Sequence, residues 1–205
     1  YQHFCDFLET HPETPIVQLD SVVGKRGGAV LLTIHFVKAE FMLAFLRERN
    51  DSKSVIRIFD DLYQLLSPAQ FKSLFKVCLT DNGSEFSNPK AIEYDSSGNL
   101  RTRIFYCNPS APYQKGSAER NHSFIRYFIP KGTDFSSYSQ KEISLMMDHI
   151  NSYKRESLGN RSPYEMFSFL YGDELLKRLE CHLIPPQEVT LNPSIFRKEV
   201  RHEIS

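Results

Sequence analysis

The amino-acid sequence predicts an α/β protein built on a mixed five-stranded sheet that is flanked by helices. Three β-rich runs open the chain, and two later strand-like runs are separated by segments with helical apolar periodicity. The 205 residues are 40% hydrophobic and 13% aromatic, which suffices for a sizeable core and argues against disorder. The 25 basic residues balance the 25 acidic ones, so bulk charge alone does not predict nucleic-acid binding.

The first three strands are predicted to form an antiparallel meander. Ile16 to Val23 is a β-rich run that contains one acid, Asp20. A glycine-rich turn of hairpin length follows at 24–28, and two further runs cover 29–36 and 41–46.

A helix and a parallel strand are predicted next. Asp51 and Ser52 supply N-cap chemistry. Apolar residues then recur with the spacing of a core-facing helix, at Val55, Ile58, Phe59, Leu62, Leu65 and Leu66. A short helix at 68–75 precedes the strand at 77–81, which ends in Asp81. Because a helix between strands makes a crossover, this strand should lie parallel to an earlier one.

The second half of the chain predicts one more strand and three helices. A turn at 95–99 leads into the strand at 102–107, and helices are expected at 117–128, 141–153 and 162–170. Three antiparallel strands followed by crossover helices and parallel strands is the ribonuclease-H-like order.

The chain is expected to divide into three parts. Residues 1–14 are a lead-in from a longer protein, because the N-terminus has neither Met nor a signal pattern. Residues 15–172 form the core, and 173–205 form a C-terminal helix and an extended tail. No apolar run is long enough to span a bilayer, so no membrane association is predicted.

The cysteines favour a reducing, cytoplasmic compartment. Cys5, Cys78, Cys107 and Cys181 lack the paired spacing of a zinc site and are too few for a disulfide scaffold. Cys78 and Cys107 sit in apolar runs and are expected to be buried.

Three carboxylates are candidates for one site. Asp20 and Asp81 should emerge at the same end of neighbouring parallel strands, although Asp81 could instead cap the turn at 82–83. Glu119 lies on the predicted helix at 117–128, where a lone Glu is usually solvated. Clustered carboxylates repel one another, and a divalent cation removes that conflict. Oxygen ligands favour Mg²⁺ or Mn²⁺, and two such ions can cleave a phosphodiester.

A basic stretch surrounds Glu119. Between residues 101 and 131 this glutamate is the one acid among six cations: Arg101, Arg103, Lys115, Arg120, Arg126 and Lys131. The stretch is either a solvated face or a groove for a polyanion.

Five blocks carry a resemblance to a known family. Residues 18–21, 79–86 and 109–121 resemble the three catalytic blocks of DDE integrases and transposases. Residues 129–134 and 158–165 narrow the resemblance to the bacterial insertion-sequence-thirty family. The similarity runs from about residue 15 to residue 172.

This resemblance implies the catalytic core of a DNA transposase, with metal-dependent strand cleavage followed by strand transfer from a 3′-hydroxyl. It implies that Asp20, Asp81 and Glu119 bind two Mg²⁺ or Mn²⁺ ions. Phosphate contacts are expected from four basic residues: Lys115, Arg120, Arg126 and Lys131. The implied partners are element ends and target DNA, with a homo-oligomer assembled on DNA at the bacterial nucleoid.

The chain departs mildly from the family pattern. Tyr113 stands where Trp is frequent, and Ser21 stands where Thr is frequent. Asp81 and Glu119 are separated by 37 residues, slightly more than usual, and the excess is assigned to the turn at 95–99.

Two alternatives keep the fold but change the activity: a catalytically inert DNA-binding module, and a nuclease that cuts without joining. A further alternative concerns the third carboxylate, because Glu85 follows Asp81 by four residues. Glu119 is preferred, since a helix with a packed apolar stripe fixes a carboxylate better than a loop does.

Overall fold

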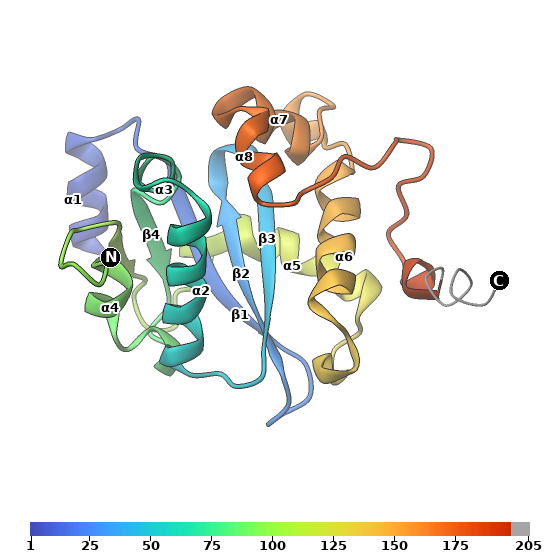
Figure 1. The fold of residues 1–205 in the computed structure, drawn as a ribbon, viewed down its shortest axis with the longest axis horizontal. Helices are drawn as coiled ribbons and strands as arrows, with labels where there is room; N and C mark the ends of the chain where they lie inside the picture. The colour runs from blue at the N-terminus through green and yellow to red at the C-terminus, as the bar shows by residue number, and fades with distance from the viewer. Residues whose placement is uncertain (198–205) are drawn as a thin grey trace.

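The computed structural model describes residues 1–197 and contains one five-stranded sheet with the order β3-β2-β1-β4-β5. The strands are β1 (Ile16–Val23), β2 (Val30–Phe36), β3 (Phe41–Arg47), β4 (Val77–Thr80) and β5 (Arg103–Tyr106). The first three pair antiparallel, and β4 and β5 run parallel to β1. This is the mixed five-stranded sheet that the sequence predicts (Figure 1).

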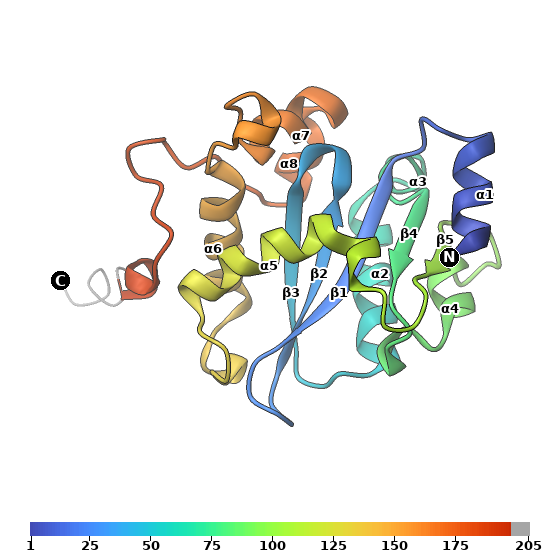
Figure 2. The ribbon, with the colours of Figure 1, turned by 180° about the vertical axis from the view of Figure 1, so that it is seen from behind.

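Helices cover both faces of the sheet. They are α1 (Gln2–Thr10), α2 (Ser52–Leu65), α3 (Pro68–Leu74), α4 (Pro89–Glu93), α5 (Gly116–Phe128), α6 (Gln140–Ser152), α7 (Pro163–Tyr171) and α8 (Asp173–Arg178). Helix α2 lies over one face (Figure 1), and α5 runs across the opposite face (Figure 2). Local chemistry sets the helix starts: Asp51 caps α2, and Ser67, Ser139 and Ser162 form capping boxes.

The alternation of side chains along β1 determines which face each residue serves. Val17 and Leu19 join the apolar core beneath α2 and α3. Val22 joins a second core, formed with α5 and α6 on the other face. Asp20 shares the parity of Val22, so its side chain lies on the face that α5 covers.

Two helices were not predicted. Helix α1 falls within the expected lead-in of 1–14, where Phe4 and Phe7 pack on Phe105 of β5 with ring centroids 5.7 and 5.6 Å apart. The short helix α4 begins at a proline after the Asn88 cap. Both cover the β4–β5 side of the sheet, so the structured part of the chain begins ahead of β1.

The extended segment after α8, residues 179–192, is hydrogen-bonded to α6. Backbone N–H groups of His182, Ile184 and Thr190 donate to side chains of Asp148, Ser152 and His149, respectively, at 3.0, 2.9 and 3.1 Å. The expected extended tail is therefore ordered through the η6 turn (Pro193–Arg197). The remainder of that prediction, at 198–205, lies outside the described residues.

Burial raises the pKa of the Asp148 carboxyl to about 6, even though His182 opposes the shift through hydrogen bonds and charge. Because this pKa is raised, the folded state keeps a proton on Asp148 between about pH 4 and pH 6, where the unfolded state has released it. The stabilisation from this bound proton is complete below about pH 4 and is lost as the pH rises through about 6.

We therefore expect the unfolding free energy of wild type to fall relative to Asp148→Asn as the pH rises from 4 to 7, by at most about 3 kcal/mol. Asparagine keeps an oxygen that can accept from His182 N–H but does not titrate. Urea denaturation at pH 4, 5, 6 and 7 measures the difference. Parallel pH profiles for the two proteins would contradict the assignment.

Candidate active site

The carboxyl ends of β1 and β4 bring Asp20 and Asp81 to one point. The strands pair in parallel, with Gln18 opposite Leu79, and Asp81 follows the last residue of β4. The ammonium nitrogen of Lys115 lies 3.1 Å from Asp20 Oδ2 and 3.3 Å from Asp81 Oδ2. The two aspartates therefore face a common cation, as the parallel pairing predicts.

The second oxygen of each aspartate is held by the backbone. Asp20 Oδ1 accepts from Ser21 N–H at 2.8 Å, and Asp81 Oδ1 accepts from Gly83 N–H at 3.0 Å. A Cβ at position 83 would lie 2.5 Å from Glu85 Oε2 and 3.0 Å from Asp81 Oδ1, which explains the glycine there. Both carboxylates are thus oriented before any ligand binds, with Oδ2 directed at the shared point.

Helix α5 is docked on the sheet beside this pair. Its first turn is tied to β1 by a bond from Ala118 N–H to Gln18 Oε1 at 3.0 Å. Ser117 Oγ lies 2.8 Å from Nε2 of His35 on β2. Ile125 is fully buried farther along, as the predicted apolar stripe requires. The helix orientation is therefore fixed by polar contacts at its start and apolar packing beyond.

His122 is a neighbour of Asp20 that the sequence motifs did not single out. Its Nδ1 lies 4.0 Å from Asp20 Oδ2, and its Nε2 lies 2.9 Å from Thr33 Oγ1, which itself donates to the main-chain oxygen of Asp20. Burial lowers the pKa of His122, and Lys115 lowers it further, while Asp20 acts in the opposite sense. The signal in the sequence was its position three residues after Glu119, on one helix face.

Glu119 occupies the first turn of α5, next to the Ala118 tether, and is exposed. Within residues 1–197, no three His, Cys, Asp or Glu side chains lie close enough to hold one metal ion. The structure thus assembles Asp20 with Asp81 and leaves Glu119 on the neighbouring helix. The competing Glu85 is buried in the η2 turn (Ser84–Phe86), which packs against α2.

The donor chemistry of the aspartate pair fits a hard divalent cation. Both groups offer carboxylate oxygen, the ligand that Mg²⁺ and Mn²⁺ prefer. An ammonium already lies within 3.3 Å of both Oδ2 atoms, so this point between the carboxylates accepts positive charge. Asp20 and Asp81 are therefore the residues that could hold such an ion.

Two residues of the predicted basic stretch face inward. Arg101 is 2% exposed and forms a 2.7 Å ion pair with Asp60 of α2, so it contributes no charge to a surface groove. Lys115 is 5% exposed, and its ammonium contacts the two aspartates instead of solvent. The six cations therefore do not all line one face. Arg101, just before β5, forms an ion pair with α2 instead of facing solvent.

The other basic candidates remain at the surface. Arg120 and Lys131 are exposed. Arg126 is half-buried and donates from Nη2 to the main-chain oxygen of Val23 at 2.9 Å, and burial lowers its pKa. Their roles as phosphate contacts stay predictions.

Arg47 links the site to α2 and was missed by sequence reasoning. It is 3% exposed, and its Nη2 donates to Ser21 Oγ at 2.7 Å and to Asn50 Oδ1 at 2.8 Å. Its Nη1 donates to Ser54 Oγ at 3.1 Å. Burial lowers the pKa of Arg47, while Glu85 and then Asp51 raise it. A buried arginine therefore braces the residue next to Asp20, and its signal was an arginine closing an apolar strand.

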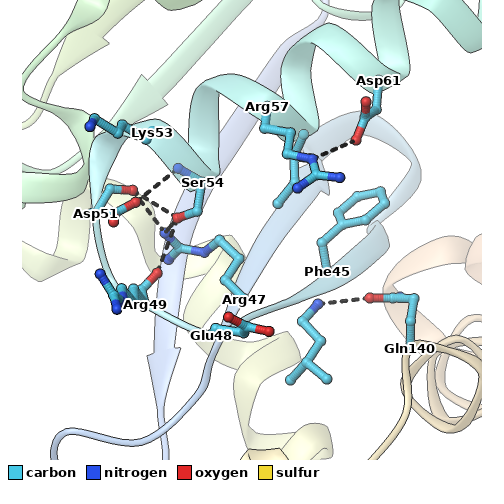
Figure 3. A pocket seen from close by; sticks show the side chains of 12 residues that line it. Phe45, Arg47, Glu48, Arg49, Asp51, Lys53, Ser54, Arg57, Asp61 and Gln140 are labelled. Carbon is cyan, nitrogen blue, oxygen red and sulfur yellow. Dashed lines mark hydrogen bonds and ion pairs between the residues drawn. The ribbon is translucent and has the colours of Figure 1, made fainter.

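Arg47 also lines an open groove of about 590 Å³ at the start of α2 (Figure 3). Basic and acidic side chains alternate there, including the pair of Arg57 with Asp61 at 3.9 Å. None of the three candidate carboxylates lines this groove. The candidate site is thus the carboxylate pair and not this hollow.

Comparison with known proteins places these features in context. The chain is 26% identical over 151 residues to the transposase of insertion sequence IS4351 from Bacteroides fragilis and 29% identical over 151 residues to a putative integrase of Spiroplasma virus SpV1-R8A2 B. Each alignment covers 74% of this chain, and 44% and 45% of the relatives, respectively. A 27% identity over 129 residues to an IS30 transposase of Escherichia coli covers 63% of this chain and 32% of that protein. The chain thus spans less than half the length of these curated relatives.

The solved structures that are similar define the fold. The catalytic core domain of BIV integrase matches 80% of this chain and 97% of its own length, with a TM-score of 0.51 and 18% identity. A simian T-cell lymphotropic virus intasome matches 74% of this chain and 53% of that chain, with a TM-score of 0.54 and 17% identity. No protein-family model matches the sequence. The ribonuclease-H-like fold and the resemblance to insertion-sequence transposases, IS30 included, are confirmed.

None of the helices in the described part of the chain has the length and apolar character needed to cross a bilayer.

Replacing Arg47 by Met should lower the unfolding free energy by about 2–4 kcal/mol, because the Ser21, Asn50 and Ser54 acceptors lose their buried donor. The matched control is Arg57→Met, which removes an exposed arginine from the same groove and should cost less than about 1 kcal/mol. Chemical denaturation measures both. Equal losses would show that Arg47 is no brace.

Proposed function

We propose that this chain is the catalytic core of a DDE-type DNA transposase, which cleaves DNA strands in a metal-dependent reaction and joins the resulting 3′-hydroxyl to target DNA. The observation that supports it most directly is the pair Asp20 and Asp81, whose Oδ2 atoms face one cation at the carboxyl ends of parallel strands. Similarity to insertion-sequence transposases on a ribonuclease-H-like fold supports the reaction class.

In this proposal Asp20 and Asp81 hold the divalent metal, Mg²⁺ or Mn²⁺, and Glu119 completes the set from α5. When bound, such ions supply an activated water or hydroxyl and neutralise the leaving oxygen of a phosphodiester. The chain supplies orientation: Ser21 N–H and Gly83 N–H hold the aspartates. No side chain is assigned as a nucleophile.

Arg120, Arg126 and Lys131 are proposed to contact DNA phosphates beside Glu119, and Lys115 to do so once its ammonium is released. The proposed partners are the DNA of element ends and of a target, with a homo-oligomer assembled on that DNA. The proposed location is the bacterial cytoplasm, at the nucleoid.

A catalytically inert DNA-binding module is the second candidate. The observation that favours it is that Glu119 does not join Asp20 and Asp81 in a shared metal group within the described residues. Strand cleavage separates the two functions, and strand transfer separates the transposase from a nuclease of the same fold.

We expect Glu119→Gln to lower strand cleavage and strand transfer by more than about 100-fold with Mn²⁺ present, because the amide is a poor metal ligand. The fold should be retained, since Glu119 is exposed. Glu85→Gln is the matched control, and it should keep activity while losing some stability. Gel assays with labelled oligonucleotides measure both steps. Loss in Glu85→Gln with activity in Glu119→Gln would overturn the assigned triad.

Arg120→Ala should weaken binding to all DNA sequences alike and reduce the dependence of log Kd on log salt by about one unit, because a phosphate contact releases one counterion. Arg57→Ala, which removes an exposed arginine from α2 on the opposite face, should leave affinity unchanged. Fluorescence anisotropy at several salt concentrations measures both. Equal effects of the two substitutions would place the DNA elsewhere.

A further inference from the structure

The ammonium of Lys115 contacts three oxygens. It donates hydrogen bonds to Asp81 Oδ2 at 3.3 Å and to the main-chain oxygen of Leu19 at 3.2 Å, and it forms an ion pair with Asp20 Oδ2 at 3.1 Å. Its side chain is 6% exposed. This buried ammonium therefore faces the two aspartates and the β1 backbone, and not a phosphate at the surface.

Resting on the proposed metal-dependent function, we propose that Lys115 is a built-in counter-ion that occupies the cation position between Asp20 and Asp81 and that a divalent ion must displace. Two carboxylates directed at one point repel each other. The ammonium relieves that repulsion without metal. Lys115 is therefore a positioning residue for the metal-free site.

Lys115 and a metal ion would compete because both need the Oδ2 atoms of Asp20 and Asp81. Ser21 and Gly83 N–H groups hold the Oδ1 atoms, so both Oδ2 atoms are shared between Lys115 and any metal that the pair binds. Two cations at one point repel each other. Ion pairing of Lys115 and metal binding therefore weaken each other by the same factor.

The position of Lys115 in the chain permits displacement. It ends the η3 turn (Pro112–Lys115) and stands at the N-cap of α5, whose next residues are tethered through Ser117 and Ala118. Its flexible stem can swing while the helix stays docked. A displaced ammonium would stand beside the metal, where the phosphate contact predicted from the sequence could form.

The test is a Mn²⁺ titration of wild type, Lys115→Met and Lys115→Gln, followed by electron paramagnetic resonance of free Mn²⁺ and by melting temperature. Both variants should bind Mn²⁺ at least about fivefold more tightly than wild type. They should melt at lower temperature in EDTA and gain more from Mn²⁺. The matched control is Lys72→Met, which removes an exposed lysine from α3 and should match wild type. Two neutral replacements guard against one that fails to fold without metal.

Adding Asp20→Asn to each background identifies the site, because tight binding should then disappear. Asp20-dependent binding that is equal or weaker in both Lys115 variants would overturn the counter-ion and leave the proposed function standing. Absence of Asp20-dependent binding in every protein would overturn the counter-ion and the proposed metal site together.

Discussion

The polar stripe on the α5 face of the sheet is the constraint on which the candidate site depends. Gln18, Thr33 and His35 are buried there, and Asp20 lies among them. A buried polar group without a hydrogen bond costs about 1–3 kcal/mol, so only an element with partners at matching positions can cover this face. Helix α5 supplies a backbone N–H, a hydroxyl and an imidazole at those positions. The sheet thereby dictates where α5 starts, and with it where Glu119 stands.

The two faces of the sheet accordingly differ in the contacts that cover them. The α2 face is closed mainly by an apolar core of aliphatic and phenylalanine side chains, and its polar contacts, such as those of Arg47 and Arg101, lie at the margins of that core. On the α5 face, burial lowers the pKa of His35 to about 3, which keeps its imidazole neutral. A neutral ring accepts a hydrogen bond from Asn121 at Nδ1 and donates one to Ser117 at Nε2. His35 therefore fixes the position of two successive turns of α5 against the sheet. Rigidity at this face is what a site with fixed carboxylates requires.

Periodicity and strand-end logic predicted most of the fold and part of the site. The five strands, helix α5 with its buried stripe, and the approach of Asp20 to Asp81 all follow from patterns within short stretches of sequence. The burial of Lys115 and Arg101 could not be predicted, because each depends on which carboxylate another segment brings near. Helix α1 was not predicted, because its apolar residues are buried only by packing against β5. Local propensity predicts the helices and strands, but it does not predict which charged side chains pair across distant segments.

The surroundings of Glu85 argue against it as the third ligand of the proposed metal, in spite of its proximity to Asp81. Its carboxylate lies on the Oδ1 side of that aspartate, across Gly83, and Oδ1 is already bound by a backbone N–H. The cation lies on the opposite oxygen, Oδ2. Glu85 also belongs to a turn packed against α2 and acts electrostatically on Arg47, where it balances a buried guanidinium. Moving Glu85 toward the proposed metal would leave Asp51 alone to offset the Arg47 charge. Glu119 is instead exposed on α5, which starts directly after Lys115.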